Sequence, residues 1–297
     1  MVVNLVDFLE EIHAGGMSDQ GLASHFGVSI EAIHHGVAQL GSEGLKIDKR
    51  GGVVCLVDSA GFGETTLSWR CRRDVQYVSQ CGSTNEIARK LDREFGVPGT
   101  VVVTDHQSAG RGRRGRSWQS QAGSNLLFSI VCRPDVQPKD APRAVLMWAA
   151  AMAEVLDIEV KWPNDLVDKS GRKIGGVLAE MDTQGDTIER VVLGVGINVN
   201  QTNFPDLPHA SSMAVLRGQT MDRAVLLARL IAAIEDVAVA TGDLTLWRRR
   251  SHTLGRHVRV GHVQGIADDI RDDGALLIDG RPVLVGDVEL VVWDKRH

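Results

Sequence analysis

The segment QSAGRGRRGRSW, residues 107–118, is the stretch around which this chain is organised. Arginines and glycines fill seven consecutive positions of it: Gly110, Arg111, Gly112, Arg113, Arg114, Gly115 and Arg116. Glycine has no side chain and accepts positive φ, so backbone N–H groups can approach a ligand closely. Arginine adds a permanent charge on a planar group that matches phosphate and carboxylate oxygens. The segment therefore predicts a loop that closes over an anionic, phosphate-bearing ligand, with a solvated basic turn as the alternative.

Residues 110–117, GRGRRGRS, differ by one residue from the P-loop pattern G-x-x-x-x-G-K-[ST]. A P-loop needs a strand before it and a helix after it, because the helix N-terminus must face the phosphates. The preceding Val101–Val103 has strand character. The following NLLFSIVC (125–132) is also an apolar run of strand length, without a helical stripe. We therefore expect the loop to join two strands, which excludes a P-loop.

The composition is that of a globular protein with two or three domains: 297 residues, 43% hydrophobic and 24% charged. The first residues show no signal-peptide pattern, and no apolar run approaches the ~20 residues of a membrane span. The four cysteines are scattered without a C-x-x-C pair, which is typical of a reduced cytoplasm. The ten histidines do not gather at metal-ligand spacing. We expect a cytoplasmic location, no membrane contact and no metal held by protein side chains.

Residues 1–62 have the pattern of a small helical domain with a hairpin. An amphipathic helix over Leu5–His13 precedes a second helix, capped at Ser18 or Asp19, and a third, capped at Ser29. Residues 45–58, interrupted by KRGG, predict the two strands of a hairpin. This order is that of a winged helix-turn-helix domain.

The charge of this domain does not favour DNA. Between residues 1 and 58 the lysines and arginines number three and the acidic residues eight. The expected recognition helix carries Glu31, His34, His35 and Gln39 but no lysine or arginine. Non-specific affinity for DNA comes mainly from phosphate neutralisation by such residues. Two functions stay open: binding of operator DNA through residues 17–52, or protein interaction and domain positioning.

Residues 63–250 alternate between helical and strand patterns. We expect a polar connector over 63–72 and a strand over Asp74–Val78. Then come Ser83, Thr84 and Asn85, before a helix that extends to Glu94. These three side chains are either a helix N-cap or partners of a neutral polar ligand group.

Two charged residues stand out further along. The turn KWPND (161–165) is fixed by its proline, and Asp165 is either a turn residue or a group that orients an incoming amine or acts as its general base. Lys173 opens the apolar strand IGGVLAEM (174–181), which directs its ammonium toward one end of the sheet. Residues 201–218 are expected to form a loop that orders over a ligand.

Residues 251–297 show short strand patterns separated by turn signals. These cover His257–Val263, Gly265–Asp269, Ala275–Ile278, Pro282–Leu284 and Val288–Val292. The spacing predicts a small SH3-like β-barrel. No residue set within it indicates catalysis.

Taken together, these pieces resemble the biotin protein ligases, in particular the bifunctional bacterial type that also represses biotin synthesis genes. Four motifs carry the resemblance in this order: GRGRRGRSW (110–118), KWPNDL (161–166), GRKIGGVLAE (171–180) and GVGINVN (194–200). The resemblance covers nearly the whole chain and implies a multidomain α/β (α+β) fold. Its parts are a winged helix-turn-helix domain (1–62), a central mixed-sheet catalytic domain of the biotin/lipoate ligase type (63–250) and an SH3-like barrel (251–297).

The resemblance implies that biotin and ATP, with Mg²⁺, give biotinoyl-5′-AMP and pyrophosphate. A lysine of the biotin carboxyl carrier protein of acetyl-CoA carboxylase then takes the biotinoyl group. By their matching positions, the resemblance implies catalytic roles for Arg111, Arg113, Asp165 and Lys173. Lys173 would bind the biotin carboxylate, and Asp165 would orient the carrier lysine. The other ligand-binding positions are Ser83, Thr84, Asn85 and Gln107 for the biotin rings, Gly112 and Trp118 in the loop, Arg114 and Arg116 for phosphate charge, and Asn198 beside the adenylate.

The resemblance also implies a homodimer when the adenylate is bound, which would pair two winged helices on a palindromic operator. Two other functions stay open. A lipoate or octanoate ligase of the same fold is disfavoured by the GRGRRG loop and by the neutral polar set at 83–85. A catalytically silent biotin-sensing repressor is disfavoured by Lys173 and the loop arginines, which a sensor does not need.

Overall fold

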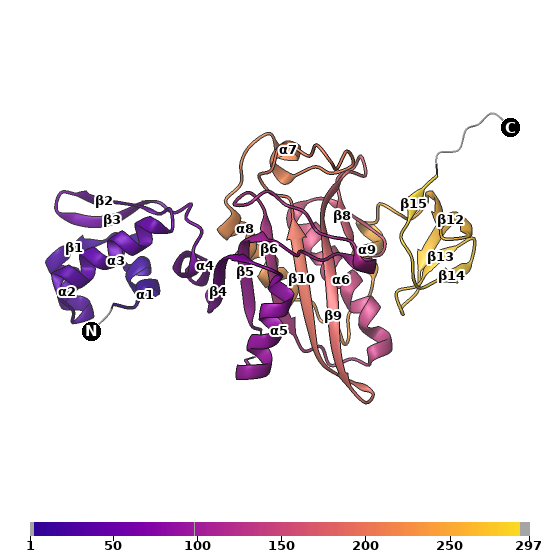
Figure 1. The fold of residues 1–297 in the computed structure, drawn as a ribbon, viewed down its shortest axis with the longest axis horizontal. Helices are drawn as coiled ribbons and strands as arrows, with labels where there is room; N and C mark the ends of the chain where they lie inside the picture. The colour runs from indigo at the N-terminus through magenta and orange to yellow at the C-terminus, as the bar shows by residue number, and fades with distance from the viewer. Residues whose placement is uncertain (1–2, 98, 292–297) are drawn as a thin grey trace. The chain divides into compact units, whose positions relative to one another are not determined.

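The computed structural model describes residues 3–97 and 99–291. They form two compact units, Met1–Tyr77 with Asp222–Arg229 and Val78–Met221 with Leu230–His297. Helix α8 (Arg223–Glu235) therefore contributes residues to both units. Figure 1 shows the elements along the chain. None of the helices in the described ranges is long and apolar enough to cross a membrane.

The first unit begins with three helices and a small sheet. The helices are α1 (Leu5–Ala14), α2 (Asp19–Phe26) and α3 (Ile30–Ser42), and the three-stranded sheet has the order β1-β3-β2, with β1 Met17–Ser18, β2 Lys46–Arg50 and β3 Val53–Asp58. Each helix starts where a polar side chain accepts a backbone N–H, as expected of an N-cap. Ser18 accepts from Gly21 N at 3.1 Å and Ser29 from Ala32 N at 3.2 Å. The expected caps and helices are thus confirmed.

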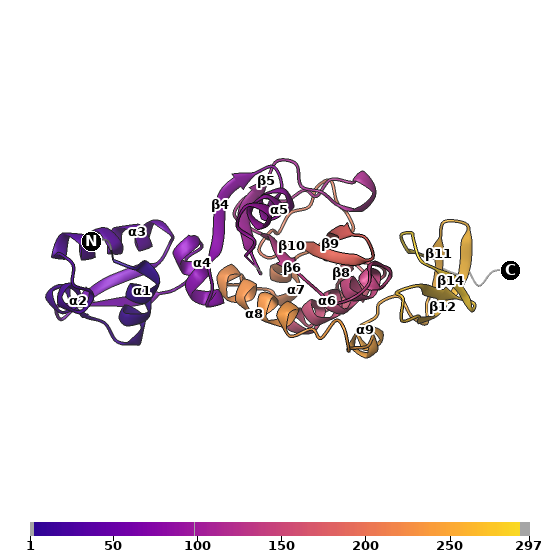
Figure 2. The same ribbon diagram turned by 90° about the horizontal axis from the view of Figure 1, so that it is seen from below.

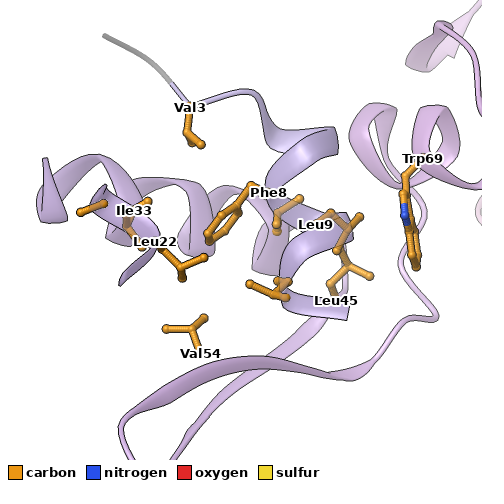
Figure 3. Close-up of a cluster of buried hydrophobic side chains, with 11 residues drawn as sticks. Val3, Phe8, Leu9, Leu22, Ile33, Leu45, Val54 and Trp69 are labelled. Carbon is orange, nitrogen blue, oxygen red and sulfur yellow. The ribbon is translucent and has the colours of Figure 1, made fainter. Parts of the chain in front are cut away.

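One apolar cluster holds this unit together. Phe8 and Leu9 of α1 pack with Leu22 of α2 and Ile33 of α3, all of them buried (Figure 3). Trp69, from a later helix, closes the cluster. The periodic apolar positions of the three helices therefore build a single core.

The segment 63–72 is a helix, α4 (Glu64–Cys71), so the expected polar connector is wrong. Its N-cap residue, Gly63, has no side chain to satisfy the first backbone N–H groups. Glu43, at the end of α3, does so instead, since its carboxylate accepts from Thr65 N at 3.1 Å and Thr66 N at 2.8 Å. A carboxylate at a helix N-terminus also interacts favourably with the helix dipole.

The second unit is built on a seven-stranded sheet with the order β4-β5-β6-β10-β9-β8-β7. The strands are β4 (Val75–Cys81), β5 (Val101–Gln107), β6 (Leu126–Cys132), β7 (Glu159–Lys161), β8 (Asp165–Val167), β9 (Lys173–Gln184) and β10 (Thr187–Ile197). Neighbours from β5 to β7 pair antiparallel, and single parallel bridges join Val160 to Ser251 and Lys173 to Ala210. The expected central mixed sheet is confirmed, and so is a loop that joins two strands at residues 108–125.

Helices cover both faces of this sheet (Figure 2). Side chains alternate along β6, so Ser129 and Val131 face α5 (Thr84–Phe95), which packs Ala88 against Val131. Ile130 points to the opposite face, and it lines a surface hollow together with Trp148 of α6 (Ala141–Leu156). The remaining helices are α7 (Met213–Arg217) and α9 (Thr245–Arg249), with 3₁₀ turns η1 (Arg113–Gly115) and η2 (Pro138–Asp140). The start of α5 and the inner side of β6 therefore share one face.

The last strands form a five-stranded sheet with the order β14-β13-β12-β11-β15. They are β11 (His257–Val260), β12 (Val263–Ile270), β13 (Leu276–Ile278), β14 (Arg281–Val283) and β15 (Glu289–Leu290). Within the described residues this sheet is open, with β14 and β15 at its edges, and no closed barrel is present. Val292, the end of the last expected strand, lies outside the described residues.

Candidate active site

A cavity opens on the face of the sheet that carries α5. Its lining comes from five places in the sequence: the start of α5, the arginine loop (residues 107–118), the KWPND turn, β9 and β10. The expected site residues at its wall are Ser83, Thr84, Asn85, Gln107, Arg111, Gly112, Arg113, Arg116, Trp118, Asp165 and Lys173. The fold thus brings together motifs that are far apart in the chain.

The inner end of the cavity is neutral and hydrogen-bonded. Thr84 and Asn85 are buried, and Thr84 N donates to Gln107 Oε1 at 2.8 Å. Ser129 Oγ lies 2.7 Å from Thr84 Oγ1 and 2.6 Å from Asn85 Oδ1. Ser83 is the N-cap residue of α5 but makes no capping bond through its side chain. Its hydroxyl is therefore not used as the helix cap that its position alone suggests.

The outer end of the cavity is charged. Lys173 Nζ lies 2.6 Å from Asp165 Oδ1 and 5.6 Å from the centre of the Trp118 ring. Lys173 is the first residue of β9, and Asp165 is the first residue of β8. An ammonium has three donors, so after its bond to Asp165 Lys173 can still donate to ligand oxygens. This end suits an anionic group.

The arginine loop is folded back on itself by backbone hydrogen bonds. Gly112 N donates to Arg116 O at 2.7 Å, and Trp118 N donates to Gly110 O at 2.8 Å. A Cβ at Gly110 would lie 2.7 Å from Trp118 O, so only glycine fits there without displacement. Gly110 thus allows the loop to close on Trp118, and the side chains of Arg111, Arg113 and Arg116 lie at the cavity wall.

Two of these arginines contact the segment between β14 and β15. Arg113 Nη1 donates to Gly286 O at 3.3 Å and to Asp287 Oδ1 at 3.4 Å, and Arg116 lies 3.1 Å from Asp287. Burial lowers the pKa of Arg113 from its usual value, and Asp287 opposes that shift. Arginine stays charged across the working range of proteins, so the cavity keeps a half-buried positive charge at this end.

The KWPND turn is anchored from behind. Trp162 is buried; its backbone N donates to Thr253 Oγ1 at 2.9 Å and its indole N–H to Gly274 O at 3.1 Å. The turn contains a cis Trp162–Pro163 bond. Asn164 lines the cavity, accepting from Arg113 at 3.4 Å and donating to Val177 O at 2.6 Å. Sequence reasoning assigned Asn164 no role in the site.

Two expected residues lie elsewhere. Arg114 is exposed with a positive φ of 56°, outside the lining of the cavity. Asn198 is buried and donates to Ser211 O at 3.0 Å, so it holds the segment after β10 in place and does not line the cavity.

Residues 201–218, expected to be a loop throughout, end in α7 (Met213–Arg217). Among the described residues no group of three or more His, Cys, Asp or Glu side chains is placed to hold a metal ion.

Gly196 on β10 leaves space for Trp118. A Cβ at this position would lie 2.5 Å from Trp118 Cε2. Gly196→Ala is therefore expected to move the indole and to weaken ligand binding by about tenfold, the equivalent of roughly 1.4 kcal/mol. Calorimetric titration of the cavity's ligands would measure the loss. In a double-mutant cycle the substitution should have little further effect once Trp118 is replaced by alanine; equal effects in both backgrounds would contradict the assignment.

A cavity with a neutral, hydrogen-bonding end and a cationic end suits a ligand with an uncharged ring and an acid group, joined to a phosphate. The family described as "Biotin/lipoate A/B protein ligase family" matches residues 78–198, which carry this cavity. The fold and the site therefore define the class: a ligase of the biotin and lipoate type.

Comparisons with individual proteins identify the family within this class. "Biotin--[acetyl-CoA-carboxylase] ligase" of Mycobacterium tuberculosis is 36% identical over 73% of this chain and 88% of its own length. "Bifunctional ligase/repressor BirA" of Bacillus spizizenii is 28% identical over 97% of this chain and 98% of its own. A solved biotin protein ligase from Aquifex aeolicus, in complex with biotin and ATP, covers 73% of this chain and 98% of its own, with 26% identity and a TM-score of 0.60. The chain belongs to the biotin protein ligase family.

Proposed function

We propose that this protein is a biotin–[biotin carboxyl carrier protein] ligase that makes biotinoyl-5′-AMP from biotin and ATP. It then transfers the biotinoyl group to a lysine of the carrier subunit of acetyl-CoA carboxylase. One observation carries the proposal: a single cavity joins the neutral set at Thr84 and Asn85 to the cationic set at Lys173 and Arg113. Biotin has this polarity, with an uncharged ring system and a carboxylate at the far end of its chain.

The first step brings two anions together. A biotin carboxylate oxygen attacks the α-phosphorus of ATP and pyrophosphate leaves, so fixed positive charge must offset the repulsion. We assign the carboxylate to Lys173 and the α-phosphate to Arg111, Arg113 and Arg116. A charged hydrogen bond of this kind contributes roughly 1.5–3 kcal/mol. Arg114, outside the cavity lining, would reach the phosphates only if the loop closes further over them, as it would to exclude water from the anhydride.

Mg²⁺ is expected to arrive with the nucleotide. Among the described residues that line the cavity, Asp165 is the one carboxylate, and it is already paired with Lys173 at 2.6 Å. This donor set does not suit a metal held by the protein alone. Mg²⁺ usually keeps several waters and binds through substrate phosphates with one or two carboxylates, so we treat Mg-ATP as the substrate.

The second step needs a free amine at the acyl carbon. The carrier lysine nitrogen attacks that carbon, the C–N bond forms and AMP leaves. We assign Asp165 to orient the incoming amine, because its carboxylate faces the cavity beside Lys173. Asn198 supports the site from outside by fixing the segment after β10 through its bond to Ser211 O at 3.0 Å.

A second function is also proposed: biotin-responsive repression through operator DNA. The full-length match to a bifunctional ligase/repressor supports it. So does the order of α1–α3 and the β2–β3 hairpin, which we interpret as a winged helix-turn-helix domain over residues 1–62. The pairing of its basic residues opposes it, since Lys49 pairs with Asp19 and Lys46 with Asp58. Each pair lowers the positive charge available to phosphates.

We further interpret residues 63–250 as the catalytic domain and the last five strands (251–297) as an SH3-like domain. The adenylate-loaded protein is proposed to dimerise, and a cytoplasmic location is proposed from the scattered cysteines. Sedimentation velocity at micromolar protein should show the dimer only after biotin and ATP are added together. Fluorescence anisotropy with operator DNA should then show binding that weakens steeply with salt. Salt-insensitive or absent binding would leave the N-terminal unit as an interaction module.

The ligase proposal is tested by incubating the protein with biotin, Mg-ATP and a biotin carboxyl carrier domain. Intact mass should show one biotinoyl increment on one lysine of the carrier. A larger turnover with lipoate or octanoate would instead establish the related acyl ligase. Biotin binding without any increment would establish a silent sensor.

A further inference from the structure

The inner end of the cavity is connected to a carboxylate that does not line it. Glu180, on β9, accepts from Asn85 Nδ2 at 2.7 Å and from Arg111 Nη2 at 3.3 Å through the same oxygen. Its side chain is 23% exposed, and Arg89 Nη2 lies 3.7 Å from the same oxygen. Glu180 thus links the start of α5 to the arginine loop, and neither the reaction nor the ring contacts account for it.

A carboxylate fixes the direction of the amide that it holds. A carboxylate only accepts hydrogen bonds, whereas an asparagine amide has a donor end and an acceptor end. Asn85 must therefore turn its Nδ2 toward Glu180, which leaves Oδ1 toward Ser129, 2.6 Å away. Gly194 leaves space for this amide, since a Cβ there would lie 2.3 Å from Asn85 Oδ1.

The orientation of the Asn85 amide also fixes the proton positions of two hydroxyl groups, those of Ser129 and Thr84. Ser129 has one proton, and Asn85 Oδ1 has none, so the proton lies between them on the serine. Ser129 Oγ then has only lone pairs for Thr84 Oγ1, which lies 2.7 Å away. Thr84 must supply the proton of that bond.

This assignment leaves two acceptors facing each other. Thr84 Oγ1 lies 3.2 Å from Gln107 Oε1, and with the threonine proton directed at Ser129 no proton remains between these two oxygens. Both atoms belong to residues at the cavity wall. An N–H group of a ligand fits there, because it satisfies acceptors that otherwise repel one another.

We propose that Glu180 is a specificity-determining positioning residue: it orients the Asn85–Ser129–Thr84 chain so that the cavity demands an N–H donor from its ligand. This rests on the proposed function, in which the cyclic urea of biotin supplies that N–H. A dithiolane ring has no N–H, so the same chain of bonds disfavours lipoate. If the side-chain amide of Asn85 were turned around, Ser129 would donate to Thr84 and Thr84 would donate to Gln107. The cavity would then no longer require an N–H donor from its ligand.

Glu180→Gln is the direct test, because a glutamine amide can donate as well as accept and so permits the reversed chain. The probes are biotin and its two cyclic carbamate analogues, each with one ring N–H replaced by oxygen. Isothermal titration should show that the wild-type protein prefers biotin over one carbamate by about a hundredfold, as expected when a buried acceptor is left unsatisfied. In Glu180→Gln this preference should fall by about tenfold, mainly through weaker binding of biotin.

Asp182→Asn is the matched control. Asp182 lies on the same strand and pairs with Arg89, Arg190 and Arg93 at 3.5, 3.4 and 3.3 Å, but no contact joins it to Asn85 among those that the structure gives it. The wild-type preference should persist in this variant. Ser129→Ala removes the proton acceptor of Thr84 and should reduce the preference as Glu180→Gln does, which keeps the test available if one variant does not fold.

An unchanged preference in both Glu180→Gln and Ser129→Ala would overturn the proposal while leaving the ligase function intact. A wild-type protein that does not bind biotin would instead overturn the proposed function itself. Glu180→Asp keeps the carboxylate, so it should keep the preference for biotin and binding constants close to those of the wild-type protein. That result would show that the preference depends on the carboxylate and not on the packing of the side chain.

Discussion

Replacing Lys173 by alanine is expected to slow formation of biotinoyl-adenylate by about 10²–10³-fold, the loss seen when one preorganised charge-stabilising donor is removed. Its ammonium lies 2.6 Å from Asp165 and over the Trp118 ring, at the charged end of the cavity. Without it, Asp165 would add a negative charge where two anions must meet. Single-turnover formation of the adenylate from biotin and labelled ATP would measure the effect.

Lys169→Ala provides the control, because Lys169 is an exposed lysine four positions earlier in the chain. It should form the adenylate at the wild-type rate. Lys173→Arg should recover little, since a planar guanidinium does not replace a compact ammonium held against one carboxylate. An alanine variant within threefold of wild type would remove Lys173 from the mechanism.

Asp92→Ala is expected to have the largest effect on stability. The Asp92 side chain is fully buried in α5 and accepts from Arg133 at 2.6 Å and Arg190 at 2.7 Å, and the Arg190 side chain is only 7% exposed. Removing one partner of a buried ion pair costs about 3–5 kcal/mol, because the other charge is left without compensation. The free energy of unfolding of the second unit should fall by that amount.

Urea denaturation would measure this loss, followed in the transition that bound biotin and ATP shift to higher urea. That transition reports the unit that contains the cavity, which matters because a chain with two compact units need not unfold in one step. Asp186→Ala, at an exposed turn, should change the free energy of unfolding by no more than about 0.5 kcal/mol. Equal effects of the two substitutions would show that the buried ion pairs contribute nothing.

The elements that were predicted correctly have local causes. Ser18 and Ser29 cap helices whose apolar faces repeat every three or four residues. The α4 helix was missed because its N-terminus is satisfied by Glu43, more than twenty residues earlier. A cap that comes from a distant residue leaves no trace in the local pattern.

The candidate site also has parts that the local sequence predicts and parts that depend on distant residues. The motifs located most of the cavity wall, because each motif lies at the end of a strand that the sheet brings to one place. What the sequence did not reveal are contacts over long separations, such as Arg113 with Asp287 and Asn85 with Glu180. Ser129 had a signal that was overlooked: it is the one hydroxyl in the apolar strand LLFSIVC (126–132).

The division of α8 between the two units has a practical consequence for anyone who wants a minimal ligase. Its residues up to Arg229 belong with Met1–Tyr77, and the Arg223 guanidinium stacks 3.7 Å from the centre of the Phe62 ring. A shortened protein that starts after Phe62 or Tyr77 would lack the residues that pack against this first half of α8. Shortened proteins should therefore carry a solubilising substitution at Val225, already 36% exposed, or keep α4, rather than be cut at the apparent linker.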